Sequence, residues 1–259
     1  MRRAYTERRV LSALALDGLP EVAAGDDLAA LVVATLPAGE ALRDGDALVV
    51  AHKVVSKAEG RVRALAAIEP GMRAQELAAA HGKDPRQVQA ILDETQELLR
   101  AQRGVLICVT RHGFVCANAG VDASNAVPGT LVLLPADPDA SARALRARLR
   151  ELTGVAPAVV IADSFGRAWR HGQVDVAIGC AGLTPLDDWR GRRDAAEREL
   201  HATWIAVADQ VAAAADLARG GKDAGRPVVL VRGIEGHVTV ADGPGARALV
   251  RPAQEDLFR

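Results

Sequence analysis

The side chains best suited to chemistry in this sequence lie in four polar, glycine-bearing segments. The first, residues 52–61, carries Lys53, Lys57 and Arg61 beside Ser56. Two lysines and an arginine near a glycine can hold phosphate oxygens, and a serine hydroxyl adds a neutral donor. Taken alone, this segment fits a solvated turn of mixed charge equally well.

The second segment, residues 116–125, alternates small residues with oxygen-bearing side chains that no apolar pattern explains. These include Asn118, Asp122, Ser124 and Asn125. Hard divalent cations prefer carboxylate and amide oxygens of this kind. An Asx-rich turn is the alternative interpretation, and this segment alone does not exclude it.

The third segment, residues 163–175, is the densest. Asp163 closes an apolar run and Ser164 follows it, a pair that can ligate a metal ion bridging phosphate groups. Side chains suited to an anionic substrate come next: Arg167, Arg170 and His171. A structural role does not easily account for one acid, one hydroxyl, two arginines and a histidine within nine residues, so we favour a functional one.

The fourth segment, residues 220–227, contains three glycines around Lys222 and Asp223. Its functional interpretation is a glycine-rich loop that holds a phosphate or a base, with the lysine supplying charge. Its structural interpretation is a helix C-cap followed by a connector.

Short β-branched runs bounded by Gly, Asp or Pro predict the buried strands that position these segments. They lie at residues 47–51, 105–109, 130–134, 158–162 and 227–231. The run 173–178 alternates polar and apolar residues, which predicts a strand with one wet face. Helices are predicted over residues 27–36, 85–99, 139–152 and 198–218, the last rich in alanine. Because strands and helices interleave irregularly, we predict a mixed α+β fold in a single unit, residues 1–259.

Composition narrows the classes of partner. Lys and Arg total 32 against 33 Asp and Glu, and aromatic residues make up only 3%. Nucleic-acid binding needs a basic stripe or a stacking platform, so we expect no nucleic-acid partner. No apolar run reaches the roughly 18 residues that span a bilayer, so we expect no membrane segment.

The cysteines and the nucleotide motifs narrow the chemistry further. Cys108, Cys116 and Cys180 have no CxxC spacing, which argues against a disulfide framework or a zinc knuckle and favours the cytoplasm. The pattern GxxxxGKS/T is absent, and residues 243–248 match only the loosest dinucleotide pattern. That match leaves no room for a βαβ unit, so we interpret it as a surface turn.

Taken together, the four segments closely resemble one family, the coenzyme F420-0:L-glutamate ligases, which are gamma-glutamyl ligases of deazaflavin biosynthesis. The matching runs are GLPE at 18–21, SKAEGR at 56–61, NAGVDASN at 118–125, DSFGRAWRHGQVDVAIG at 163–179 and GGKDAGRP at 220–227. They follow the family's order and extend over nearly the whole chain. The run at 163–179 is the most specific.

The resemblance implies a GTP-dependent amide ligase with largely antiparallel sheets and packed helices in two intertwined lobes, assembled as a homodimer. It also implies two divalent ions, Mg²⁺ or Mn²⁺, and a potassium ion. The implied GTP-binding residues are Leu19, Pro20, Glu21, Val22, His52, Lys53, Lys57, Asn125, Gly220, Gly221, Lys222, Asp223 and Gly225. The implied metal ligands are Asp122, Asp163 and Ser164.

The mechanism we infer from this resemblance proceeds through an acyl phosphate. The γ-phosphoryl group of GTP passes to the phospholactyl carboxylate of F420-0, and the amine of L-glutamate then attacks to form the amide. Lys57, Arg167 and Asp163 are the residues expected to carry the reaction, the two cations by stabilising developing negative charge. The number of glutamates added stays open.

Other interpretations stay open beside this one. Some family members carry a fused nitroreductase-like domain, for which this chain has no room, so no redox activity is expected. A ligase of the same fold acting on another carboxylate is one alternative, since a fold and a phosphate site do not fix the acceptor. A non-catalytic nucleotide-binding homologue and a metal-dependent hydrolase are the others.

Overall fold

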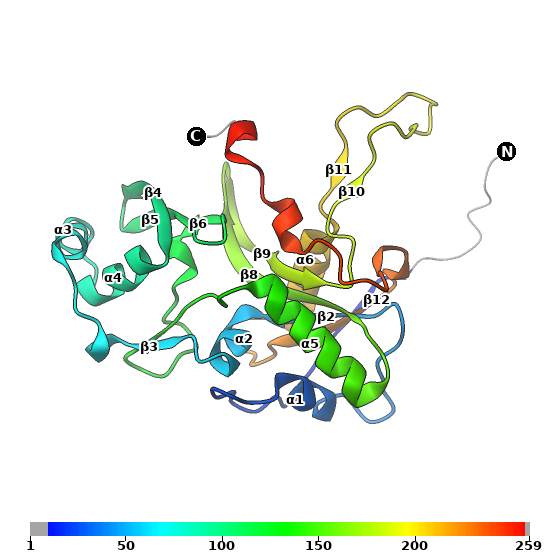
Figure 1. Cartoon of the computed structure of the whole chain (residues 1–259), viewed down its shortest axis with the longest axis horizontal. Coiled ribbons are helices and arrows are strands. Elements are labelled where there is room, and N and C mark those ends of the chain that lie inside the picture. Colours follow the sequence, from blue (N-terminus) through cyan, green and yellow to red (C-terminus); the bar gives the residue numbers. More distant parts are fainter. Residues whose placement is uncertain (1–9, 257–259) are drawn as a thin grey trace.

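The computed structural model describes residues 10–256 and is organised around a mixed five-stranded sheet (Figure 1). In spatial order its strands are β1 (Ser12–Ala15), β12 (Val228–Arg232), β2 (Ala47–Ala51), β8 (Ala158–Arg167) and β9 (Arg170–Ala181). β2 and β8 run parallel, whereas every other pair of neighbours in this sheet is antiparallel. The predicted α+β class with largely antiparallel sheets is therefore confirmed.

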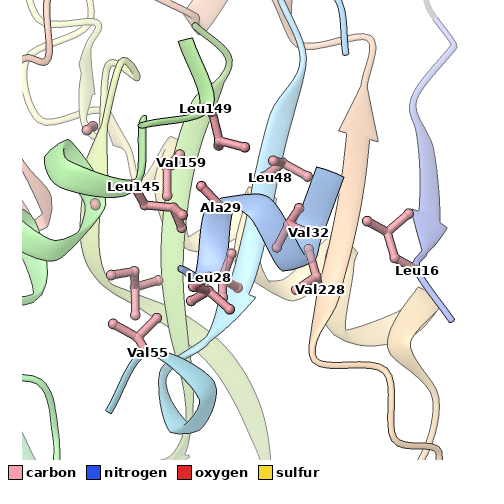
Figure 2. Packing of buried hydrophobic residues seen from close by; sticks show 14 of the residues in the cluster. Leu16, Leu28, Ala29, Val32, Leu48, Val55, Leu145, Leu149, Val159 and Val228 are labelled. Atoms are coloured by element: carbon pink, nitrogen blue, oxygen red, sulfur yellow. The ribbon is translucent and has the colours of Figure 1, made fainter. Parts of the chain in front are cut away.

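Helices cover both faces of this main sheet. Successive residues of a strand point to opposite sides, so each buried strand contributes side chains to two apolar clusters. Leu48 and Val50 of β2 pack against α1 (Leu28–Ala34) and α5 (Pro138–Thr153), in the cluster drawn in Figure 2. Ala47 and Val49 pack against α6 (Val207–Arg219) on the other face. All four of these β2 side chains are fully buried, so the strand reads as a continuous apolar run.

Between α2 (His52–Ala58) and α5, the chain builds a second core, here called the second lobe (residues 62–133). Figure 1 shows it beside the main sheet. β3 (Val62–Ala64) pairs with β7 (Thr130–Val132), and a three-stranded sheet orders β4 (Thr95–Gln102), β5 (Val105–Thr110) and β6 (Val115–Ala117). α3 (Met72–His81) and α4 (Pro85–Asp93) pack on that sheet through a separate apolar cluster.

The smaller elements lie outside these two cores. β10 (Asp187–Asp188) and β11 (Trp204–Ile205) form a two-stranded arm that extends from the body in Figure 1. Short 3-10 turns lie at Leu65–Ala67, Asn118–Gly120, Glu235–His237, Ala246–Leu249 and Ala253–Glu255. Within residues 10–256, no helix combines the length and the apolar character needed to cross a membrane.

Most of the predicted elements are confirmed, together with the local signals that begin and end them. The predicted strands overlap β2, β5, β7, β8 and β12. The first two predicted helices contain α1 and α4, and the third lies within α5. Asp27 and Asp84 cap the N-termini of α1 and α4 by accepting the backbone N–H of Ala30 and Arg86. Gly154 ends α5 in the left-handed conformation.

Two predicted helices are too long. The helix predicted to reach residue 99 ends at Asp93, and Leu98 lies in β4, paired with Cys108 of β5. Thr95 donates its hydroxyl to the Ile91 carbonyl at the end of α4. Leu98 keeps its helical spacing from α4, but strand pairing, a long-range interaction, overrides that local pattern.

The helix predicted over 198–218 begins only at Val207. Leu200 precedes the helix, and Trp204 belongs to β11, where the Arg190 guanidinium lies 4.3 Å from the centre of its ring. The helix's buried alanines pack against the sheet of their own chain: Ala208, Ala212 and Ala215.

Two loop expectations and one strand expectation are also corrected. Residues 52–58 form α2 rather than a turn, and residues 163–175 belong to the long β8–β9 hairpin. The face of β9 predicted to be wet is buried at Asp175, which is 1% exposed. The turn at 243–248 lies mostly at the surface, as predicted, although within it Ala246 is fully buried and donates its N–H to Asp139.

The approach of β9 to the start of α5 gives a test of the packing. A Cβ at Gly179 would lie 2.3 Å from the Pro138 carbonyl oxygen, and backbone at that position has little freedom to move. Gly179→Ala should therefore lower the free energy of unfolding by about 1–3 kcal/mol in urea denaturation. Gly236→Ala is the control, because no atom lies within 4 Å of its added Cβ; equal losses in both variants would contradict this packing.

Candidate functional site

A cavity of about 860 Å³ opens at the carboxyl end of β2 and beside residues 162–166 of the parallel strand β8. Ligands commonly bind where parallel strands of α/β sheets end. Both lobes line it: the main sheet and its loops on one side and residues 116–127 on the other. All the implied nucleotide and metal residues border it: Leu19, Pro20, Glu21, Val22, His52, Lys53, Lys57, Asp122, Asn125, Asp163, Ser164, Gly220, Gly221, Lys222, Asp223 and Gly225.

α2 presents two ammonium groups to this cavity. Lys53 and Lys57 are four residues apart and so share one face of the helix. The Lys53 Nζ lies 2.7 Å from Asp122 Oδ2 and 2.6 Å from Ser124 Oγ, and the Lys57 Nζ lies 2.5 Å from Glu21 Oε1. Each lysine is thus held by a carboxylate from another segment, and an anionic ligand would compete with those carboxylates.

Asp122 is strongly held in its ionised form. Burial alone would raise the pKa of its carboxyl, but hydrogen bonds from Lys53 and from the backbone and hydroxyl of Ser124 outweigh burial and lower that pKa to about 2. Asp122 therefore remains a full negative charge on the cavity wall at neutral pH.

This lowered pKa makes the stabilisation by Asp122 depend on pH. The ionised carboxylate stabilises the fold above its ordinary pKa of 3.8, and that contribution is lost as the pH falls toward 2. Asp122→Asn should therefore reduce the free energy of unfolding at pH 7 by about 1 kcal/mol, after allowance for solvent screening. Urea titrations with a chelator present should show the difference from the unsubstituted protein shrink as the pH falls through 2 and vanish below it; a difference that persists there would contradict it.

Asp163 and Ser164 are consecutive residues of β8 and have different buried partners. The Asp163 Oδ1 accepts the Ser164 N–H at 2.8 Å and lies 3.4 Å from His52 Nε2. The Ser164 hydroxyl donates to Asp175 Oδ1 at 2.7 Å, and the other oxygen of Asp175 pairs with Arg219. The site thus connects two strands of the main sheet to the end of α6.

Sequence reasoning missed Asp175, Asp216 and Arg219, all of which border the cavity. Burial and the nearby charge of Asp175 raise the pKa of Asp216. The partner of Asp175 lies 44 residues away in the chain, so no local pattern reveals the pair. Asp216 and Arg219 lie one turn apart at the end of an alanine-rich helix, and that charged turn was a usable signal.

Several predicted anion-binding residues lie away from the cavity. Arg61 is structural: its guanidinium donates to the Leu134 carbonyl and to Glu94. Arg167 is exposed at the end of the β8–β9 hairpin, where it donates to the carbonyl of His171, and it does not border the cavity. β8 and β9 continue through residues 163–175, where a loop was expected, so the turn that joins them lies away from the cavity.

The oxygen ligands present fit a divalent ion only in company with a substrate. No cluster of three or more His, Cys, Asp or Glu side chains suited to a metal ion exists in the described part of the chain. Asp163 and Ser164 nevertheless offer adjacent carboxylate and hydroxyl oxygens on the cavity wall. Mg²⁺ is commonly held by one or two carboxylates together with substrate phosphates, which matches this incomplete set.

The cavity offers no activated cysteine nucleophile among the described residues. Cys116 borders it, but burial and the neighbouring charge of Asp163 raise the pKa of its thiol to about 12. A thiol with that pKa stays protonated at neutral pH and is a poor nucleophile. The inferred mechanism, which needs no protein nucleophile, agrees with this environment.

Comparison with known proteins gives one consistent result. A family model described as F420-0:Gamma-glutamyl ligase matches residues 18–233. A protein named Coenzyme F420:L-glutamate ligase from Methanothermobacter thermautotrophicus is 47% identical over 251 residues, which cover 96% of this chain and 99% of the relative. Relatives of the same name from Methanopyrus kandleri and Haloarcula marismortui are 48% and 43% identical, over 92% and 96% of this chain and 94% and 96% of their own.

Proposed function

This chain belongs to the F420-0:gamma-glutamyl ligase family, and on that premise we propose that it joins L-glutamate to coenzyme F420-0 with GTP as the phosphoryl donor. The single observation that supports this most is the convergence of five separated segments on one cavity. Those segments supply three lysines, several carboxylates and a glycine-rich loop, which together suit a nucleoside triphosphate.

The proposed reaction has two steps. In the first, an oxygen of the acceptor's phospholactyl carboxylate attacks the γ-phosphorus of GTP, which forms an acyl phosphate and releases GDP. In the second, the amine of L-glutamate attacks the acyl carbon, loses a proton and forms the amide, while inorganic phosphate leaves. Lys53 and Lys57 bind the phosphate groups and offset the negative charge that develops during transfer.

Asp122, Asp163 and Ser164 are the proposed ligands of two divalent ions, Mg²⁺ or Mn²⁺. When bound, such ions neutralise phosphate charge and orient the group that is transferred. K⁺ as an activating ion and a homodimeric assembly are further parts of the proposal. Because Arg167 lies outside the cavity lining, we assign the stabilisation of charge to the two lysines of α2.

The acyl phosphate makes a specific prediction. With hydroxylamine in place of L-glutamate, the protein should convert F420-0 to its hydroxamate and GTP to GDP and phosphate in equal amounts, because an activated carboxyl group accepts any strong amine nucleophile. Mass spectrometry of the acceptor and quantification of phosphate measure the two products.

Reactions without GTP, or with ATP in its place, are the controls for the phosphoryl donor. Hydroxamate formed in the absence of any nucleotide would contradict the acyl-phosphate route. Equal rates with ATP and GTP would contradict the proposed dependence on GTP.

A further inference from the structure

We propose that His52 is a positioning residue that holds the Asp163 carboxylate in place and does not itself bind the nucleotide. The inference rests on the proposed function, in which Asp163 ligates a divalent ion. It differs from the nucleotide-binding role that the resemblance implied for His52.

The parallel pairing of β2 and β8 brings these two residues together. Ala51, the last residue of β2, lies opposite Ala162 of β8. The residues that follow this pair are His52, the first residue of α2, and Asp163, which lies within β8, so the two are side by side on the cavity wall. The His52 Nε2 lies 3.4 Å from Asp163 Oδ1.

Both nitrogens of the His52 ring face protein groups. The side chain is 3% exposed, and its Nδ1 lies 3.5 Å from the hydroxyl of Ser56, which is itself fully buried. We assign the Ser56 hydroxyl as the donor to Nδ1, which leaves the ring proton on Nε2. That buried Nε2 makes no hydrogen bond among the described residues, and the Asp163 carboxylate, 3.4 Å away, is the acceptor that we assign to it.

α2 places His52 and Ser56 on a different face from Lys53 and Lys57. His52 and Ser56 are four residues apart and form one row along the helix, which turns toward the protein interior. Lys53 and Lys57 form the adjacent row, whose ammonium groups meet Asp122 and Glu21 across the cavity. In this proposal the row of Lys53 and Lys57 binds phosphate, and the row of His52 and Ser56 supports Asp163.

Carboxylates that bind metal ions are oriented by hydrogen bonds from neighbouring groups, and loss of such a partner typically weakens metal binding 10- to 100-fold. We therefore expect His52→Leu, which keeps the volume but removes both ring nitrogens, to weaken Mn²⁺ binding by about 10- to 100-fold. His52→Gln retains an amide donor and should recover part of that loss. Ser56→Ala removes only the group on Nδ1 and should weaken Mn²⁺ binding less than His52→Leu.

The test measures two affinities in the full chain. Free Mn²⁺ is followed by electron paramagnetic resonance with GDP present, and GDP binding is followed by calorimetry in a chelator. In each variant, GDP affinity without metal should stay within about twofold of the unsubstituted protein while Mn²⁺ affinity falls. His201→Leu on the exposed arm is the matched control, and it should change neither affinity.

Two results would overturn the inference. A loss of metal-free GDP affinity as large as the loss of Mn²⁺ affinity would make His52 a nucleotide contact, and unchanged Mn²⁺ affinity in both His52 variants would exclude a positioning role. Circular dichroism identifies any variant that fails to fold; if His52→Leu fails, His52→Gln and Ser56→Ala decide. An unsubstituted protein that binds Mn²⁺ and GDP but adds no glutamate would overturn the proposed function alone.

Discussion

Replacing Asp163 by asparagine should lower the kcat of glutamate addition by roughly 10²- to 10³-fold, the scale of losing one charge-stabilising contact in a transition state. The substitution keeps the shape of the side chain but removes the charge that borders the cavity beside Ser164. Steady-state rates with GTP, Mn²⁺, L-glutamate and F420-0 measure the effect.

The control for this prediction is the melting temperature of the Asp163→Asn variant. Within the described residues, the Asp163 side chain accepts one backbone hydrogen bond, from the Ser164 N–H, and an amide oxygen can accept that bond as well. The melting temperature of Asp163→Asn should therefore stay close to that of the unsubstituted protein. Activity within threefold of the unsubstituted protein would remove Asp163 from the proposed site.

Replacing Arg146 by alanine should destabilise the protein by about 1.5–3 kcal/mol, the scale of hydrogen bonds made by a charged group, because the guanidinium is buried while its partner Asp242 is 45% exposed. Its buried guanidinium bonds to the Asp242 carboxylate and to backbone carbonyls of residues 156, 157, 239 and 240. A Cβ at Gly182 would lie 2.3 Å from its Nε, so the guanidinium also packs tightly on β9's end. Without it, the carbonyl of the buried Pro157 loses its donor, whereas the other acceptors are partly open to water.

Urea denaturation measures this loss, and Arg148→Ala on the same helix is the matched control. Arg148 makes two ion pairs, with Asp27 and Glu151, but its side chain is largely exposed. Exposed ion pairs contribute little to stability, so its loss should be far smaller. Similar losses in the two variants would show that the buried guanidinium does not connect α5 to residues 239–242 as the structure indicates.

The sequence predicted the parts of the fold that local signals control. β2 is a continuous apolar run because both of its faces are buried, and Asp84 followed by Pro85 begins α4 as expected. The prediction from sequence failed where pairing between distant segments of the chain determines the structure. Leu98 keeps helical spacing but pairs in a strand, and Trp204 is taken into the arm by Asp188 and Arg190.

The same distinction applies to the site. Residues in compact motifs, such as Lys53, Asp122 and Asp163, were predicted and do border one cavity. Asp175 was predicted to face water, because its partner Arg219 comes from another element and the motif gives no sign of it. Arg167 belongs to the most specific motif, yet the length of the hairpin places it outside the cavity.

The central claim is that this cavity ligates L-glutamate to coenzyme F420-0. The most direct test incubates the purified protein with GTP, Mg²⁺ or Mn²⁺, K⁺, L-glutamate and F420-0, and follows the acceptor by mass spectrometry. We predict a mass increase of one or more glutamyl residues, dependent on GTP and lost in Asp163→Asn. An unchanged acceptor mass, with GDP and Mn²⁺ still bound by the protein, would contradict the account.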